Sequence, residues 1–179
     1  MMIDCGTVFL RKPELDDIDD LYKQKNDLEV TSLLGGFSKG LSKKQIGLWI
    51  ESHNNNDDEV LLVICDKESG KCIGHAGLYD IDHRSRAAEY GIVIGNREFW
   101  GRGVGKLVSN KFLEYGFSML NLNRIQLSVL VKNSRAIHLY ELLGFQKEGV
   151  LREAVYKDWK YQDVLLMSLL KNEFVVDNA

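Results

Sequence analysis

The spacing of apolar residues divides the first third of the chain into one short strand and two helices. Apolar side chains at 7–10 predict a strand, and Pro13 soon after it begins a segment with a helical period over 13–27. A proline in the first turn followed by acidic residues is typical of a helix N-terminus. A second helical period covers 43–55, where Ser42 is placed to cap the first turn. The expected core stripes are Leu15, Ile18, Leu21 and Tyr22 in the first helix, and Ile46, Trp49, Ile50 and His53 in the second.

The rest of the chain begins with strands and then alternates strand and helix. The glycine-rich segment 35–40 is expected to be a loop. Strands are predicted at 60–66 and 72–80, joined as a hairpin by a turn rich in Lys, Ser and Gly. A third strand, 87–95, is apolar at most positions, which is typical of a central strand. The next elements are a helix from 104 to about 120 and a strand at 124–131. A short helix follows within 133–145, with Asn133 or Ser134 as N-cap and Gly144 as C-cap. The chain ends in two strands that turn near 157–160.

This order of elements predicts one α/β domain over 1–179. Strands that begin antiparallel and end as strand–helix–strand indicate a mixed, mostly antiparallel, twisted sheet of about seven strands with helices on both faces. A chain of 179 residues is large enough to bury a core of this kind.

Composition narrows the function classes. Hydrophobic residues make up 45% and the formal net charge is -3, so a general nucleic-acid binder is not expected. No apolar run approaches the about 20 residues that cross a bilayer, and the N-terminal residues do not resemble a signal peptide, so a cytoplasmic protein is expected. The three cysteines form no C-x-x-C pair and the four histidines lack metal-ligand spacing, which favours free thiols and no metal site.

The glycine-rich stretch EFWGRGVGK, residues 98–106, points to an anion. It matches neither the Walker loop nor the dinucleotide-binding loop, because Trp100 and Lys106 stand where those motifs need glycine. It lies between a predicted strand and a predicted helix, so free N–H groups at the helix N-terminus would face the loop. Glycines allow the backbone to approach a pyrophosphate closely. By itself the loop is equally compatible with a tight strand–helix connection.

Two motifs together resemble the GNAT superfamily of acetyl-CoA-dependent N-acetyltransferases. Residues 100–105, WGRGVG, are similar to the pyrophosphate loop Gln/Arg-x-x-Gly-x-Gly/Ala, with Trp100 departing at its first position. About thirty residues later, NSRAIHLYELLGF is similar to the family helix Asn-x-x-Ala-x-x-x-Tyr-x-x-x-Gly-Phe. The resemblance extends over nearly the whole chain and is closest to the branch of ribosomal-protein (Rim-type) and spermidine N-acetyltransferases. It implies an enzyme that moves an acetyl group from acetyl-CoA to a primary amine by direct attack.

The resemblance also implies two catalytic residues. Tyr140 corresponds to the tyrosine that protonates the leaving thiolate, although its place in an apolar stripe also suits core packing. Glu89 corresponds to a strand glutamate that acts as a base through water, and burial there would help it accept a proton near neutral pH. Glu89 is also compatible with holding a cationic acceptor, or with an ion pair to Arg84 or Arg86 in the preceding loop.

The cofactor-binding residues follow from the same resemblance. The strand after Glu89 is expected to diverge from its neighbour and to offer backbone groups to the pantetheine arm, with an N–H that also serves the oxyanion. That role falls on Ile92, Val93 and Ile94, and the pyrophosphate is assigned to Trp100, Gly101, Arg102, Gly103, Val104, Gly105 and Lys106. Asn133 and Arg135 are further candidate contacts, with a helix cap and a solvated surface charge as their ordinary alternatives.

The acceptor is left open by these motifs. Three hypotheses remain: acetylation of a protein N-terminus, acetylation of a small amine such as a polyamine or an amino-sugar, and an acyl-CoA-binding sensor without catalysis. The presence of both Glu89 and Tyr140 argues against the sensor, because a pure binder needs neither. Residues 1–30 contain eight acidic and four basic residues, which suits a cationic acceptor or simply a solvated helix face. A homodimer is compatible with the final strands.

Overall fold

The computed structural model describes residues 2–36 and 39–175, and in it the strands form one sheet. The order across the sheet is β1-β2-β3-β4-β5-β6-β8-β7. The strands are β1 (Met2–Asp4), β2 (Val8–Arg11), β3 (Val60–Asp66), β4 (Cys72–Asp82), β5 (Ala87–Ile94), β6 (Arg124–Leu130), β7 (Gln146–Lys157) and β8 (Lys160–Leu170). The α-helices are α1 (Ile18–Lys25), α2 (Leu28–Ser32), α3 (Lys43–Asn54), α4 (Val104–Ser118) and α5 (Ser134–Leu142), and the 3-10 turns are η1 (Leu15–Asp17) and η2 (Arg97–Phe99).

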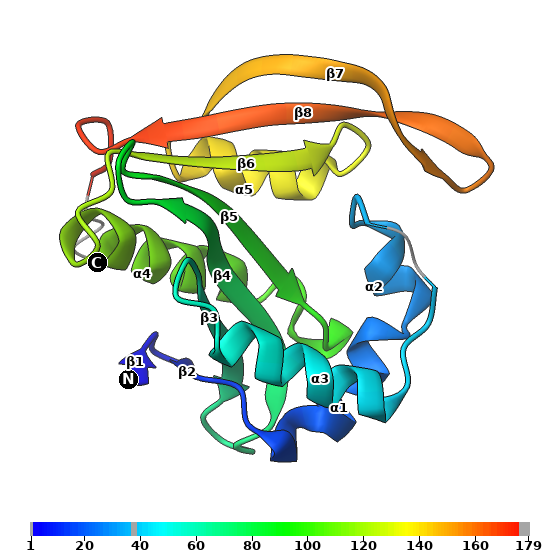
Figure 1. Ribbon diagram of the computed structural model, residues 1–179. Helices are drawn as coiled ribbons and strands as arrows, with labels where there is room; N and C mark the ends of the chain where they lie inside the picture. Colours follow the sequence, from blue (N-terminus) through cyan, green and yellow to red (C-terminus); the bar gives the residue numbers. More distant parts are fainter. Residues whose placement is uncertain (1, 37–38, 176–179) are drawn as a thin grey trace.

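Among the described strands only β5 and β6 pair in parallel, and they do so over a short length. Their register joins Ala87, Ala88 and Glu89 to Arg124, Ile125 and Gln126, and β6 then continues along β8 alone. Figure 1 shows β5 and β6 side by side at one end and far apart at the other. The expected divergence after Glu89 is therefore present.

The helices lie on both faces of the sheet, as alternate residues of β3 show. Leu62 and Ile64 belong to the core that also contains Val108 and Phe112 of α4. Val63 and Cys65 face the opposite way and pack with the buried residues of α1 and α3, which include Leu21, Ile46 and Ile50. The predicted mixed, mostly antiparallel sheet with helices on both faces is confirmed.

The first predicted helix is wrong in detail. A 3-10 turn at Leu15–Asp17 precedes α1, and Leu15 and Tyr22 are exposed rather than in the core. The reason is Asp17, which is buried and accepts two 2.7 Å hydrogen bonds from the Arg11 guanidinium. This ion pair holds the turn against the end of β2. The buried positions of α1 are Leu21 and Gln24 instead.

Three further elements were not predicted. β1 adds an eighth strand at the edge of the sheet, α2 follows α1 directly, and η2 precedes the glycine loop. The remaining predicted strands and helices agree with the observed elements to within a few residues, and Asn133 is the N-cap of α5. The predicted loop at 35–40 includes 37–38, which lie outside the described residues.

The described part of the chain contains no helix long and apolar enough to cross a membrane. Cys5, Cys65 and Cys72 are free and buried. No group of three or more His, Cys, Asp or Glu residues suited to a metal ion occurs among the described residues.

Candidate active site

The glycine loop opens directly onto the N-terminus of α4. Gly101 and Gly103 both have φ +77, in the left-handed region, and a Cβ at either position would meet nothing within 4 Å. Gly103 is the N-cap of α4 and no side chain caps the helix. The first-turn N–H groups of a helix have no intrahelical partners and carry a partial positive charge. The open backbone beside this turn therefore fits an anionic group such as a pyrophosphate.

Two aromatic side chains and two arginines connect the loop to its surroundings. The Trp100 indole Nε1 donates a 2.7 Å hydrogen bond to the Ile94 carbonyl oxygen, which fixes the loop to the end of β5. The Arg135 guanidinium of α5 lies 5.5 Å from the Trp100 ring centroid, and the Arg102 guanidinium lies 5.2 Å from the Phe99 ring centroid. The tryptophan that departs from the family motif thus links β5, the loop and α5.

Ile92, Val93 and Ile94 form the part of β5 that has left β6. They remain paired with Ala76, His75 and Gly74 of β4, but no β6 register extends to them. One backbone edge of these three residues is therefore not used by the sheet. An unpaired strand edge offers N–H and C=O groups, as an extended pantetheine arm needs, although the Ile94 carbonyl already accepts the Trp100 indole N–H.

Tyr140 lies on α5, near the start of α4. Its side chain is buried and its ring centroid lies 5.7 Å from that of Phe145. The hydroxyl makes no hydrogen bond within the described part of the chain. Burial raises the pKa of this hydroxyl to about 12, so Tyr140 is protonated at neutral pH and can act as a proton donor. A Cβ added to Gly105 would lie 3.2 Å from Leu139 Cδ2, so α5 packs closely against the first turn of α4.

Glu89 is less buried than expected. Its side chain is partly exposed on β5, opposite Tyr79 of β4, on the sheet face that α1 and α3 cover. Among the described residues its carboxylate makes no hydrogen bond or ion pair, so the expected pair with Arg84 or Arg86 is not formed. The carboxylate is therefore available to a substrate or a water molecule.

The Asn133 side chain makes hydrogen bonds within the protein. Its Oδ1 accepts a 3.2 Å hydrogen bond from the Ala136 N–H and caps α5, and its Nδ2 donates one of 3.2 Å to the Leu33 carbonyl oxygen. Both ends of the amide are engaged, which supports a positioning role. Arg135 is exposed, as its ordinary alternative requires, but it lies over Trp100 beside the loop.

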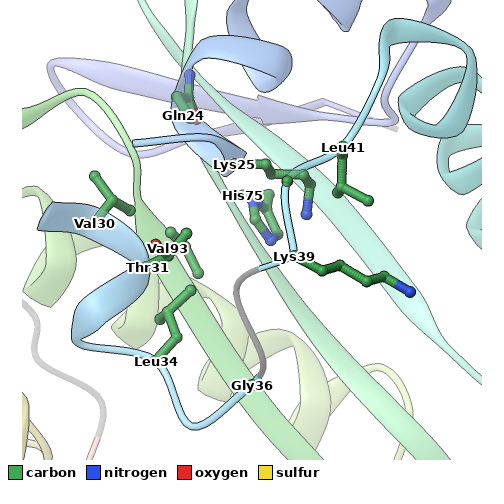
Figure 2. A pocket seen from close by; sticks show the side chains of 11 residues that line it. Gln24, Lys25, Val30, Thr31, Leu34, Gly36, Lys39, Leu41, His75 and Val93 are labelled. Atoms are coloured by element: carbon green, nitrogen blue, oxygen red, sulfur yellow. The ribbon is translucent and has the colours of Figure 1, made fainter. Parts of the chain in front are cut away.

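A pocket of about 220 Å³ lies beside the diverging segment of β5. Figure 2 shows it between α1, the chain after α2, and strands β4 and β5. Val93 belongs to both regions, because its backbone is in the diverging segment and its side chain faces the pocket. The described lining residues are Gln24, Lys25, Val30, Thr31, Leu34, Gly36, Lys39, Gly40, Leu41, His75 and Val93.

Two basic groups lie together in this pocket. The Lys25 ammonium is 3.8 Å from the Trp49 ring centroid, and burial lowers the pKa of Lys25 to about 8. His75 is 8% exposed, and its Nδ1 is buried without a hydrogen-bond partner. Burial, together with the nearby charge of Lys25, lowers the pKa of His75 well below its usual range, so this imidazole is neutral.

One lysine from the last hairpin fixes the wall of the pocket. Lys157 Nζ donates hydrogen bonds to three carbonyl oxygens, those of Thr31 at 2.6 Å, Leu34 at 2.6 Å and Gly36 at 2.9 Å. Thr31 lies in the last turn of α2, where its carbonyl also accepts the Leu34 N–H at 3.1 Å, and Leu34 lies in the turn that follows. Figure 1 shows α2 between the end of β5 and the tip of the β7–β8 hairpin.

Sequence reasoning missed Lys25, His75 and Lys157. A weak signal existed for His75, a single basic residue inside the apolar run 73–79, but metal-ligand spacing alone does not detect it. Lys25 gave none, because it ends a helix rich in charged residues. The contacts of Lys157 join residues more than 120 positions apart.

Comparison with known proteins matches this arrangement to one family. The family model described as an acetyltransferase (GNAT) domain matches residues 7–146. The uncharacterized N-acetyltransferase p20 of Bacillus licheniformis is 35% identical over 92% of this chain and 93% of its own length. The spermidine N(1)-acetyltransferase of Vibrio cholerae serotype O1 is 37% identical over 69% of this chain and 70% of its own length. A crystal structure of the Vibrio cholerae spermidine N-acetyltransferase with CoA and spermine superposes with a TM-score of 0.86 at 31% identity, covering 93% of this chain and 97% of that one.

The chain therefore belongs to the GNAT acetyltransferase family. The expected class, an N-acetyltransferase with acetyl-CoA as its donor, is confirmed. The similarity to spermidine N-acetyltransferases agrees with the branch that the sequence motifs indicated.

Proposed function

We propose that the chain binds acetyl-CoA between the diverging strands β5 and β6 and transfers its acetyl group to a primary amine by direct attack. The observation that carries this proposal is the geometry of one open edge: at Ile92–Ile94 the β6 side of β5 is unpaired, and the uncapped N-terminus of α4 follows this segment. Gly101 and Gly103 leave space for the pyrophosphate at that helix, with Arg102, Lys106 and Arg135 as the nearby cations.

The chain's own residues then supply proton transfer and orientation. A backbone N–H of Ile92–Ile94 donates to the negative charge that develops on the acetyl oxygen. The amine nitrogen forms a bond to the acetyl carbon while the carbon–sulfur bond breaks, and Tyr140 gives its proton to the departing sulfur. Glu89 receives the proton that the ammonium loses before attack, directly or through water. The nitrogen loses a second proton as the amide forms, and this proton restores the Tyr140 hydroxyl through solvent. Because the amine attacks the thioester directly, no nucleophilic side chain is required.

The acceptor is proposed to be a small amine. Relatives named spermidine N-acetyltransferases support a polyamine, and the spermine in the Vibrio cholerae structure supports the same class. A protein N-terminus and an amino-sugar stay as candidates. A homodimer is also proposed, because β7 is an edge strand with exposed Val150 and Leu151.

The experiment that tests this function is release of free thiol from acetyl-CoA with a panel of amines. The panel contains spermidine, spermine, glucosamine and peptides that begin with Ser or Ala. We expect thiol release that depends on the amine, with one acetylated product for each thiol. Binding of acetyl-CoA without transfer to any amine would contradict the proposal and favour the sensor.

A further inference from the structure

The pocket beside Val93 has an unusual charge for an enzyme whose relatives acetylate polyamines. Among its described lining residues are two lysines and one histidine, and none is acidic. Figure 2 shows the side chain of Lys25 beside His75 on the inner side of the pocket, whereas Lys39 extends outward from its rim. A cationic acceptor would meet like charge here, which is destabilising.

The Lys25 ammonium has no anionic partner among the described residues. Its ammonium rests on the Trp49 ring, and it makes no ion pair with a carboxylate in the described part of the chain. Removing an ammonium from water costs free energy unless an opposite charge or hydrogen bonds replace the lost hydration. The lowered pKa of Lys25, about 8, reflects this cost. An anion placed in the pocket would offset it.

His75 is a second polar side chain in the lining of the pocket. Its Nδ1 is fully buried and has no hydrogen-bond partner, although buried polar atoms nearly always have one. His75 stands directly opposite Val93 in the β4–β5 register, so it lies next to the segment proposed to hold the acetyl group. A neutral imidazole here can hydrogen-bond a ligand without adding charge.

The rest of the lining is mostly apolar and the volume is small. Val30, Leu34, Leu41 and Val93 supply aliphatic surface, and about 220 Å³ is below the usual range for drug-sized ligands. The pocket therefore suits a small molecule with an apolar body and one anionic group.

We infer that the acceptor is a primary amine that also carries a carboxylate, and that Lys25 binds this carboxylate in the pocket between α1, α2, β4 and β5. His75 completes the polar end of the site. This inference rests on the proposed acetyl transfer and names its substrate class. Lys25 acts as a specificity-determining residue, because it favours an acceptor with a negative charge and disfavours one that is positive throughout.

The test compares amines that differ only in the carboxylate. Leucine is compared with leucinamide, and 6-aminohexanoate with hexylamine, with spermidine added as the polycation. Thiol release is measured at pH 7, where Lys25 is mostly protonated, and binding to the protein–CoA complex is measured by calorimetry. At least one of the two carboxylate-bearing amines is expected to exceed its counterpart without a carboxylate in kcat/KM and in affinity by about tenfold or more, as for a hydrogen bond to a charged group.

Variants of Lys25 test whether this side chain causes the preference for a carboxylate. Lys25→Met is expected to remove the preference for the carboxylate while leaving the affinity for acetyl-CoA unchanged, and Lys25→Arg is expected to retain it. The matched control is Lys44→Met, an exposed lysine of α3 outside the pocket, which should behave as the wild type. Thermal melting of each variant shows whether it is folded.

The outcomes separate this inference from the proposed function. Equal binding and turnover of both pairs, no binding of either carboxylate, or the same preference in Lys25→Met would overturn the inference. Acetylation of spermidine in any of those cases would leave the proposed acetyl transfer standing. A failure of every amine to cause thiol release would count against the proposed function, and calorimetry would still decide the carboxylate site.

Discussion

The Tyr140 ring packs in the hydrophobic core, and its hydroxyl has no hydrogen-bond partner among the described residues. The core role and the catalytic role are compatible because they use different atoms of one side chain. The hydroxyl keeps its proton at neutral pH, as its raised pKa requires, so it is ready to protonate a leaving thiolate. Removing only the oxygen separates the two roles.

Tyr140→Phe is expected to lower kcat by about 10²–10⁴-fold, the usual contribution of general acid catalysis. The Kd for acetyl-CoA should stay the same, because the ring remains against Phe145. Steady-state kinetics and calorimetry give the two numbers. A Tyr140→Phe variant with wild-type turnover would exclude the hydroxyl as the acid.

Gly103 has a left-handed backbone conformation and is proposed to lie beside the pyrophosphate. Gly103→Ala is expected to weaken acetyl-CoA binding, because its φ of +77 strains any L side chain and a Cβ would project into the open space at α4. Gly70 in the β3–β4 turn gives a matched control, since its φ is +70 and its Cβ would also meet nothing. Gly70→Ala should lose a similar stability of about 1–2 kcal/mol and bind acetyl-CoA normally. Equal affinities of the two variants would show that the loop does not hold the cofactor.

Among the elements, α2 connects the two diverging parts of the sheet. The Arg97 guanidinium, at the end of β5, pairs with Asp27 at 3.1 Å and with Glu29 at the start of α2. Lys157 and Asn133, from beyond β6, bind the carbonyl groups at its other end. This short helix is therefore fixed from both sides of the opening between β5 and β6.

Lys157→Met is expected to loosen the end of α2 and the pocket wall that follows it. The lost hydrogen bonds to a charged donor suggest a local cost of about 1.5–3 kcal/mol. Amide hydrogen exchange at Leu33 and Leu34 should accelerate, and KM for the acceptor should rise more than KM for acetyl-CoA. Lys160→Met is the control, because Lys160 is exposed on the other side of the same hairpin turn. The same exchange rates in both variants would mean that Lys157 does not hold this segment.

The sequence predicted the long elements well and the short ones poorly. Strands β3 to β8 and helices α3 to α5 have clear periods or glycine boundaries, so their order gave the correct sheet. α2 has only five residues, too few for a hydrophobic period, and contacts with distant residues stabilise it. Its one local signal is Asp27, whose side chain accepts the N–H of Glu29 at 2.9 Å as an N-cap.

Motif spacing predicted the proposed cofactor side of the site, and tertiary structure was needed to propose the acceptor side. The glycine loop and the α5 motif each lie within a few residues of chain, so Gly103 and Tyr140 could be named in advance. The pocket instead assembles Lys25 from α1, His75 from β4 and Val93 from β5. Only the strand register and helix packing bring these residues together. The acidic N-terminal segment was compatible with a cationic acceptor or with a solvated helix face, whereas the described lining of the pocket contains basic residues and no acidic one.

On the scale of the whole molecule, the proposed site is an opening between two parts of one sheet. Three residue pairs of β5 and β6 join β1–β5 to β6–β8, and beyond them α2 bridges the gap. Binding in this opening would satisfy the free edge of β5 and the N-terminus of α4 at the same time. A ligand that spans both features should therefore protect residues from separate elements together.

Hydrogen exchange with and without acetyl-CoA tests this placement most directly. We predict slower exchange at the amides of Ile92–Ile94 and, in the same titration, at Val104 and Gly105 of the first turn of α4. Amides of β1 and β2 at the far edge should be unchanged. Protection confined to another part of the chain, or none at saturating acetyl-CoA, would contradict a cofactor site between β5 and β6.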